Sequence, residues 1–514
     1  MQIDNSANNK RIAKNTLLLY VRTMFTMAIS LYTSRVILDT LGVEDYGIYN
    51  VVGGFVAMFS VISGSLSNSI SRYITYELGH GDWQKLKIIF STSINIQLFL
   101  SLIILLLGET VGIWFLNEKM NIPTERLFAA NWVLHLSILS FVVNLISVPY
   151  NAVIVAHEKM SAFAYVSIIE VTLKLIIVYL LYISLWDKLI VYSILLVLVS
   201  VIIRIVYGIY CNKHFTETHY VKVHDKELVK EMTSFAWWGF FGNAAWMLNT
   251  QGVNILINLF FGVSVNAARG IAVQVESALI KFINDFTTAI NPQITKSYAL
   301  GDSARMVMLV NKGSKFSFFL NLLISLPVLF EAEYILSLWL VEVPEHTVAF
   351  IRLVIIATMI QKFGDTGVTA CMATGTIRKY AIWITTVGCL VFPLTWIAYE
   401  FGASAESAYI VFALVYILVN LTRLWLMVGL LGFPVWIYIK EVYGRSIIVV
   451  SLSCIFPFLI YNYIPLSFSR LLISCVVCII STITSIYFAG LTRGERIEIT
   501  TKLRTICLYR KHSA

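Results

Sequence analysis

Fourteen long apolar runs take up most of the chain and limit what it can fold into. A bilayer core of roughly 30 Å is crossed by a helix of about 20 apolar residues, and only helices or closed barrels satisfy every backbone group in lipid. The chain is therefore predicted to be an all-α polytopic membrane protein with about 14 transmembrane helices. The runs are 15–38, 47–71, 88–108, 127–155, 162–184, 188–210, 233–260, 264–291, 316–340, 347–372, 380–400, 404–430, 446–464 and 467–490.

Two of these runs are weakly hydrophobic. Residues 47–71 and 264–291 are rich in Gly, Ser, Thr and Asn. Both runs are too long and too well bounded to be loops. We therefore expect helices that face a hydrated or tightly packed interior.

Basic residues are distributed unevenly between the two sides of the expected membrane. Most of the 38 Lys and Arg fall in loops and tails on the N-terminal side, and few fall on the other side. This is the positive-inside pattern, and it predicts that both termini are cytoplasmic. Topology thus accounts for the net charge of +9, which gives no support to nucleic-acid binding. With 58% apolar and 13% charged residues, no half of the chain is polar enough to be a water-soluble domain.

Residues 42–102 and 262–322 align without a gap at an offset of 220. The paired positions include Gly42 with Gly262, and Gly81–Asp82 with Gly301–Asp302 at the end of the same cytoplasmic loop. Two units of six spans that enter the membrane the same way are parallel repeats, with a pseudo-twofold axis along the membrane normal and a site expected between them. The predicted divisions are an N-lobe at 10–212, a cytoplasmic linker at 213–231, a C-lobe at 232–432, an additional helix pair at 433–490 and a basic cytoplasmic tail at 491–514.

Several cations lie inside the expected spans, where each charge costs about 2.5–3.5 kcal/mol at mid-bilayer on insertion scales and needs a partner or water. Local pairs at helical spacing could neutralise some of them, namely Glu170 with Lys174, Lys281 with Asp285, and Lys362 with Asp365. Plain helix-surface pairing is an equally good interpretation of these three pairs. The candidates for a cationic substrate-binding cavity are Arg22, Lys281, Arg352, Lys362 and Arg423.

Polar residues repeat along one face of several spans, which is typical of the wall of a hydrated cavity, although small-residue packing remains an alternative. In the fourth span the stripe includes Ser137, Ser140 and Asn144. A net-cationic cavity suits an anionic ligand, and arginine suits phosphate because its planar fork binds two oxygens. The other residues expected to line the cavity are Thr26, Asn243, Asn254, Asn284 and Thr288.

Intramembrane carboxylates are the candidates for coupling transport to a proton or sodium ion. The sequence lacks a GxxxxGK[ST] phosphate loop and His/Cys clusters with metal-ligand spacing. It therefore predicts a transporter rather than an enzyme, with no cofactor and no metal site. The ion-coupling candidates are Asp285, Asp365, Glu170 and Glu276.

Three stretches resemble bacterial O-antigen and capsular polysaccharide flippases of the multidrug/oligosaccharidyl-lipid/polysaccharide exporter superfamily. They are RIAKNTLLLYVRTMFTMAISLYTSRVILDTLGVEDYGIYNVVGG, YELGHGDWQKLKIIFSTS and VPYNAVIVAHEKMSAFAYVSIIE. The resemblance implies a two-lobed helical bundle in the bacterial inner membrane. It also implies an undecaprenyl-diphosphate-linked oligosaccharide as substrate, with a polysaccharide polymerase and a chain-length regulator as partners.

Two other functions remain open at this point. One is an ion-coupled drug/cation antiporter of the multidrug and toxic-compound extrusion type, for which a net-acidic cavity is expected. The other is a non-transporting membrane scaffold for polysaccharide assembly, which would not need buried unpaired arginines.

Overall fold

A computed structural model describes most of the chain. The described residues are 5–157, 159–223, 225–234, 247–374, 377–497 and 500–501.

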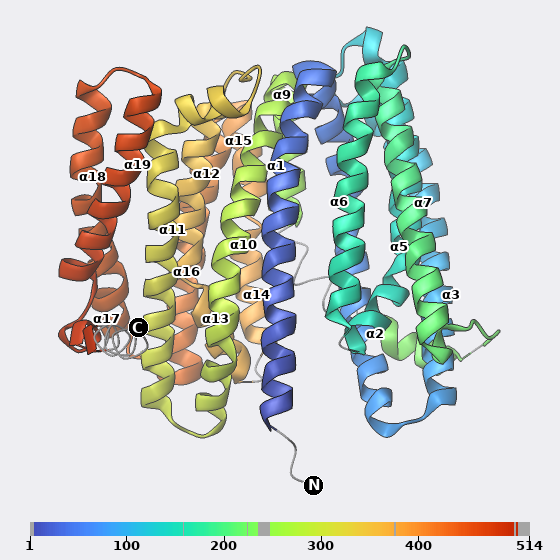
Figure 1. The fold of residues 1–514 in the computed structure, drawn as a ribbon, viewed down its shortest axis with the longest axis horizontal. Helices are drawn as coiled ribbons and strands as arrows, with labels where there is room; N and C mark the ends of the chain where they lie inside the picture. The colour runs from blue at the N-terminus through green and yellow to red at the C-terminus, as the bar shows by residue number, and fades with distance from the viewer. Residues whose placement is uncertain are drawn as a thin grey trace, which may run out of the picture. The chain divides into compact units, whose positions relative to one another are not determined.

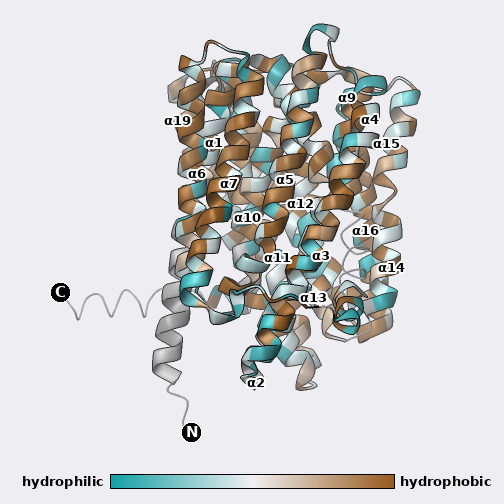
Figure 2. Ribbon diagram, turned by 90° about the vertical axis from the view of Figure 1, so that its right-hand side faces the viewer, coloured by the Kyte–Doolittle hydropathy of each residue, from teal (hydrophilic) through white to brown (hydrophobic). Residues whose placement is uncertain are grey.

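The described chain is helical, and ten of its helical stretches are long and apolar enough to cross a membrane. Of the other four expected spans, 15–38 lies in α1 (Asn5–Ala57), 47–71 runs from the end of α1 into α2 (Ser60–His80), and 264–291 lies in α10 (Val263–Ala299). The fourth, 233–260, lies partly outside the described residues. The prediction of an all-α polytopic membrane protein is therefore confirmed. Figure 2 shows mostly hydrophobic residues along α5, α6 and α7, with hydrophilic residues gathered at the helix ends. The ten stretches are Trp83–Glu118, Thr124–Ala156, Ser161–Ile183, Lys188–His214, Ser303–Trp339, Thr347–Ala373, Arg378–Glu400, Ser407–Leu431, Val435–Tyr463 and Phe468–Gly490.

The contacts within the chain divide it into two compact units. Unit 1 comprises Met1–Ile271, Trp339–Glu345 and Phe392–Ala405, and unit 2 comprises Ala272–Leu338, His346–Val391 and Glu406–Ala514.

The helices of unit 1 run from α1 to α9, and α6 and α7 pack side by side (Figure 1). Their bounds are α1 (Asn5–Ala57), α2 (Ser60–His80), α3 (Trp83–Leu107), α4 (Ile113–Glu118), α5 (Leu127–Ala156), α6 (Met160–Ile183), α7 (Lys188–His214) and α9 (Val253–Phe261). The chain then continues into α10 (Val263–Ala299), in which unit 2 begins, and α15 (Val391–Glu400) lies mostly in unit 1.

In unit 2, α18 and α19 form a side-by-side pair. The helices are α11 (Ser303–Trp339), α12 (Thr347–Lys362), α13 (Asp365–Ala373), α14 (Ile377–Gly388), α16 (Ser407–Leu431), α17 (Val435–Tyr438), α18 (Arg445–Tyr463) and α19 (Phe468–Ser485).

Unit 1 extends beyond the N-lobe limits predicted at 10–212 because α9 and the start of α10 pack on α1. Asn254 Nδ2 donates to the Asn50 carbonyl at 3.2 Å. Gly47 has no room for a side chain, since a Cβ there would lie 1.9 Å from the Val263 carbonyl oxygen. The limits of the two six-span lobes remain a prediction.

The first two expected spans are not separated by a loop. Helix α1 continues to Ala57 through a single non-helical residue, Gly42 (φ 79°, ψ 171°). The second expected span, 47–71, is instead interrupted at Met58 and Phe59, between α1 and α2. A positive φ is accessible to glycine without steric cost, so one residue is enough to redirect the helix.

The repeat found in the sequence is also present in the backbone. Gly42 and Gly262 have φ of 79° and 81°, and Gly81 and Gly301 have φ of 76° and 72°. Asp82 accepts a hydrogen bond from the Lys85 backbone nitrogen at 3.0 Å, and Asp302 accepts one from Arg305 at the same distance. The paired positions therefore share the same turn chemistry.

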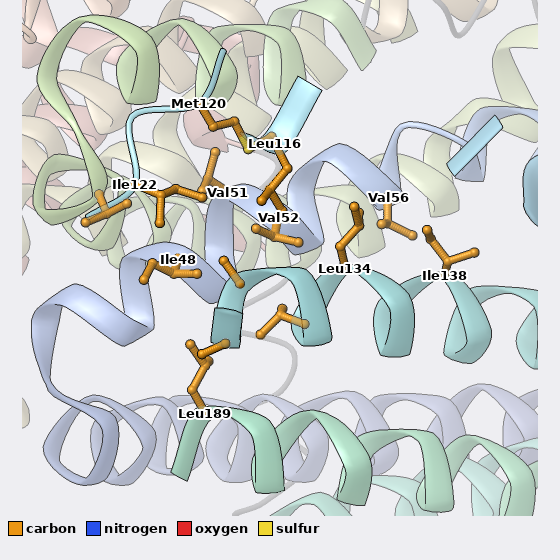
Figure 3. Packing of buried hydrophobic residues seen from close by; sticks show 14 residues of the cluster. Ile48, Val51, Val52, Val56, Leu116, Met120, Ile122, Leu134, Ile138 and Leu189 are labelled. Carbon is orange, nitrogen blue, oxygen red and sulfur yellow. The ribbon is translucent and has the colours of Figure 1, made fainter. Parts of the chain in front are cut away.

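A hydrophobic cluster and an ion-pair network close the expected outer end of unit 1. Ile48, Val51 and Val52 of α1 pack in this cluster with Leu134 of α5 and Leu189 of α7 (Figure 3). The cluster excludes water from the helices that converge there.

Arg126 holds three segments together beside this cluster. Its guanidinium donates to both carboxylate oxygens of Asp45, at 2.8 and 2.6 Å, and also to Asp187 at 2.6 Å. Asp187 additionally caps α7 by accepting from the Leu189 backbone nitrogen. The two-oxygen geometry is the strong form of an arginine–carboxylate contact.

The chain after α7 packs on the expected inner end of unit 1. Glu217 accepts a hydrogen bond from His157 Nε2 at 2.5 Å. The Val221 backbone nitrogen donates to Ser91 Oγ at 3.0 Å, and Tyr220 Oη donates to Asn95 Oδ1 at 3.0 Å. This part of the predicted linker therefore follows α3 and α5 rather than extending into water.

Replacing Glu217 with Gln is expected to remove a pH-dependent part of the stability. Burial alone would raise the pKa of Glu217, but the hydrogen bond from His157, a backbone hydrogen bond and the nearby positive charges together lower that pKa. A carboxylate whose pKa is lower in the folded state than in the unfolded chain increases the free energy of unfolding. This contribution is complete above the ordinary pKa of about 4.3. It is lost as the pH falls through the lowered folded-state pKa. Thermal unfolding of the purified protein should show Glu217→Gln less stable than wild type at pH 7, with the difference shrinking on acidification. Glu118→Gln at an exposed carboxylate is the control, and a Glu217→Gln curve that matched it would refute this role.

Candidate functional site

A helix break lies inside an expected span of unit 2. Helix α12 ends at Lys362 and α13 begins at Asp365, and Phe363 and Gly364 between them form a turn that keeps the backbone in the right-handed region, so the break is a local distortion of one span. An interrupted helix in a membrane leaves backbone groups that need partners from the protein or from water.

Side chains from other helices fill the break. Asn420 Nδ2 of α16 donates to the Ile360 carbonyl at 2.7 Å. The Tyr438 hydroxyl of α17 donates to the Phe363 carbonyl and lies 2.9 Å from Ser314 Oγ of α11. These two carbonyls therefore have side-chain donors from other helices.

Arg423 of α16 packs directly on this break. Its side chain is 8% exposed. Its Nε donates to Tyr380 Oη at 3.0 Å, and its Nη1 donates to Asn420 Oδ1 at 2.8 Å. Gly364 is required opposite it, because a Cβ at that position would lie 1.4 Å from Nη1.

The hydrogen-bond partners of Arg423 are neutral, so its charge is not cancelled by a bonded carboxylate. Among the described residues, its second terminal nitrogen, Nη2, has no hydrogen-bond partner. Asp365 is close enough to act on the guanidinium electrostatically but forms no hydrogen bond with it. One edge of the guanidinium fork therefore keeps hydrogen-bonding capacity.

Lys362 lies on the other side of the same break, but its charge is paired. Its Nζ donates to Asp365 at 2.7 Å and to Asn284 Oδ1 of α10 at 2.9 Å, and the residue is 5% exposed. The predicted Lys362–Asp365 pair is therefore confirmed. The group around the break contains two cations, Arg423 and Lys362, and one carboxylate, Asp365, so its net charge is positive.

The other candidates in unit 2 are not part of this group as far as the structure describes them. Arg352 Nε donates to the Leu329 carbonyl at 3.1 Å, and the guanidinium carbon lies 5.9 Å from the Tyr461 ring centre. Lys281 is exposed on α10, and Glu276 lies on the same helix, partly exposed. The side chains of Asp285 and Thr288 lie outside the described residues.

The candidates in unit 1 include a second cation with unsatisfied hydrogen-bonding capacity. Arg22 of α1 stacks over the Phe163 ring at 4.4 Å, and its Nε is buried without a partner among the described residues. Glu170 and Tyr207 are close enough to act on it electrostatically. Glu170 also pairs with Lys174 at 2.6 Å, as the spacing predicts.

The polar residues expected in unit 1 mostly bond to backbone. Thr26 Oγ1 donates to the Thr23 carbonyl of its own helix at 3.1 Å. Asn254 donates to Asn50 and accepts from Asn266 at 2.9 Å. Asn243 lies outside the described residues.

Sequence reasoning missed two buried ion pairs in unit 2. Lys315 Nζ lies 2.6 Å from Glu495, and Arg470 Nε lies 3.0 Å from Glu331. All four residues are under 10% exposed. The only local signal is the spacing Thr-x-x-Glu at Thr492–Glu495, which is a capping box and is formed in the structure by reciprocal bonds of 2.8 and 3.3 Å.

A family model described as polysaccharide biosynthesis protein matches residues 12–298. A curated relative, the uncharacterized membrane protein EpsK of Bacillus subtilis (strain 168), is 21% identical over 307 residues, which is 59% of this chain and 60% of the relative. The chain thus aligns with only about 60% of the length of that relative.

Solved transporters share the fold. An inward-facing multidrug resistance MATE family transporter of the MOP superfamily superposes with a TM-score of 0.68 and 13% identity, covering 80% of this chain and 95% of that one. The lipid II flippase MurJ in an inward closed conformation gives a TM-score of 0.64 and 14% identity, covering 91% of this chain and 98% of that one. Because the family model covers more than half of the sequence, the chain belongs to the polysaccharide biosynthesis protein family, and it has the fold of MOP-superfamily transporters.

Proposed function

We propose that the protein is a flippase that moves an undecaprenyl-diphosphate-linked oligosaccharide from the cytoplasmic to the periplasmic leaflet. The oligosaccharide is the repeat unit of an O-antigen or another surface polysaccharide. The family match supports the polysaccharide part of this proposal, and the shared fold with the lipid II flippase MurJ supports the movement of a lipid-linked substrate.

The observation that carries the proposal is the environment of Arg423. This guanidinium is buried at a helix break, bonded only to neutral groups, and has one terminal nitrogen unoccupied among the described residues. A diphosphate offers the oxygen acceptors that an arginine fork binds. Lys362, Lys281, Arg352 and Arg22 are the further cations assigned to the head group.

The physical problem is to move a charged head group through hydrocarbon while its polyprenyl tail stays in lipid. The head group exchanges water for arginine, lysine, asparagine and threonine side chains, and the two lobes rock about it to give alternating access. Movement of one charge across the membrane is worth roughly 2.3 kcal/mol per 100 mV. An ion gradient would act through Asp285, Asp365, Glu170 or Glu276.

The proposal places the protein in a bacterial inner membrane with both termini cytoplasmic, beside a polysaccharide polymerase and a chain-length regulator. In this arrangement the additional pair α18–α19 provides surface for the lipid tail. MurJ covers 91% of this chain, whereas the MATE transporter covers 80%. The additional coverage supports a role for the segments that lie outside the MATE-like part.

A cell-based test separates this function from the two alternatives. Deleting the gene from its host should make undecaprenyl-linked repeat units accumulate on the cytoplasmic side, and wild-type protein should restore export. Unchanged export with a new sensitivity to cationic drugs would indicate an antiporter instead. Full restoration by an Arg423→Gln protein at wild-type abundance would remove Arg423 from the substrate site and would favour a scaffold.

A further inference from the structure

Unit 1 contains a partly open cavity of about 190 Å³ between α1, α5 and α7. It lies beside the hydrophobic cluster of the expected outer end, because Val56 belongs to both. Its lining includes Tyr49 and Gly53 of α1, Ser137, Phe141 and Asn144 of α5, and Ser193 of α7.

The lining combines neutral polar groups with apolar side chains such as Val56, Leu136 and Leu196 and carries no charge, which distinguishes it from the cationic group at the helix break of unit 2. Its polar atoms are hydroxyls and one amide, and two aromatic rings stand among them. An ion would be poorly stabilised here, since a buried charge needs a counter-charge. The chemistry favours a neutral ligand with several hydroxyl groups.

Two of the polar side chains retain hydrogen-bonding capacity. Among the described residues, Ser137 makes no hydrogen bond, and Asn144 makes only a 3.5 Å contact to Ser200 Oγ through its nitrogen. Ser193 is already engaged with the Leu189 carbonyl at 3.0 Å. The free donors and acceptors are therefore on α5 and face the cavity.

Gly53 keeps the cavity open on the α1 side. A Cβ at Gly53 would meet no atom within 4 Å. At the next residue, Gly54, a Cβ would lie 2.7 Å from both Asn254 and Gln251. The two glycines thus serve different purposes, close packing at Gly54 and open space at Gly53.

We propose that this cavity binds one neutral sugar ring of the carried oligosaccharide, an inference that rests on the proposed flippase function. Sugar hydroxyls match the free groups of Ser137 and Asn144, and the C–H face of a sugar ring suits the negative face of an aromatic ring such as Tyr49 or Phe141. The volume is below the roughly 300–1,000 Å³ of pockets for drug-sized ligands. It therefore suits one ring rather than a whole repeat unit.

The test compares two lipids on the purified full-length protein by native mass spectrometry. One probe is undecaprenyl diphosphate, and the other is undecaprenyl diphosphate that carries a single N-acetylglucosamine. Wild type is expected to bind the glycosylated lipid about tenfold more tightly. Gly53→Leu, which fills the cavity, and Ser137→Ala, which removes a hydroxyl, should each reduce that preference at least threefold, with the affinity for undecaprenyl diphosphate unchanged.

Gly429→Leu is the matched control, because a Cβ at Gly429 in α16 also meets no atom within 4 Å. It should retain the wild-type preference. Equal wild-type affinity for the two lipids, or a full preference in both cavity variants, would show a cavity that holds water only and would leave the flippase function standing. Failure of wild type to bind either lipid would overturn the flippase function, and the sugar site with it.

Discussion

Arg470→Met is expected to destabilise the protein by about 3–5 kcal/mol, the range for removing one partner of a buried ion pair. Glu331 is 1% exposed, and its carboxylate receives the Arg470 Nε at 3.0 Å. Its second oxygen, Oε2, is already buried without a partner among the described residues. Without Arg470 the whole carboxylate would be buried and unpaired.

The double variant Arg470→Met/Glu331→Met should recover most of that loss. Replacing both members of a buried pair by apolar residues is often neutral, since neither charge is then left in the interior. Some loss should remain, because Arg470 Nη1 also donates to the Ile464 carbonyl at 3.1 Å. Thermal unfolding in detergent measures all three proteins, with Lys440→Met at an exposed lysine as the control. A double variant as unstable as Arg470→Met would show that packing, not charge, is responsible.

This pair matters because α11 carries two ion-pair partners for the C-terminal part of the chain. Glu331 binds Arg470 at the start of α19, and Lys315 binds Glu495 beyond the end of α19. Burial alone would raise the pKa of Glu495, but the hydrogen bond and charge of Lys315, together with hydrogen bonds from Thr492, keep that pKa lowered. Ion pairs at the start of α19 and beyond its end therefore tie this helix to α11.

Arg423→Gln is expected to reduce transport of the lipid-linked oligosaccharide at least tenfold. The substitution removes the cation that no bonded carboxylate neutralises while keeping a side chain that can hydrogen-bond to Tyr380 or Asn420. Losing one charge-assisted contact to phosphate costs about 1.5–3 kcal/mol, which is at least tenfold in affinity. Export of the repeat unit in cells, normalised to protein abundance, measures the effect.

Two further variants separate charge from position at this site. Arg423→Lys keeps the charge but not the planar fork, so transport should recover only in part. Gly364→Ala keeps Arg423 but places a methyl group where Nη1 lies, so it should also lower transport. Arg378→Gln, at an exposed arginine at the start of α14, is the matched control. Wild-type export by Arg423→Gln would remove this residue from the substrate site.

Periodicity and local spacing predicted the features that depend on neighbours in the sequence. The apolar runs predicted the membrane helices, the Gly-Asp repeat predicted two matching turns, and i,i+3 or i,i+4 spacing predicted the Glu170–Lys174 and Lys362–Asp365 pairs. Each of these signals lies within a few residues, where helix geometry alone decides which side chains meet.

Contacts between distant segments could not be predicted in this way. Lys315 and Glu495 are separated by 180 positions, and Arg470 and Glu331 by 139. No helical phase relates these residues, and Glu331 lies within a long apolar run whose hydrophobicity masks a single carboxylate. The break at Gly364 was missed for a related reason: hydrophobicity is averaged over a window, and a single glycine with polar neighbours does not interrupt it.

Flipping in reconstituted vesicles tests the central claim most directly. Wild-type protein is placed in vesicles with a fluorescent undecaprenyl-diphosphate-linked oligosaccharide, and a quencher that cannot cross the membrane reports the fraction in the outer leaflet over time. The account predicts exchange between leaflets with wild type, at least tenfold slower exchange with Arg423→Gln, and none in protein-free vesicles. Wild-type vesicles that exchange the lipid no faster than protein-free vesicles would contradict it.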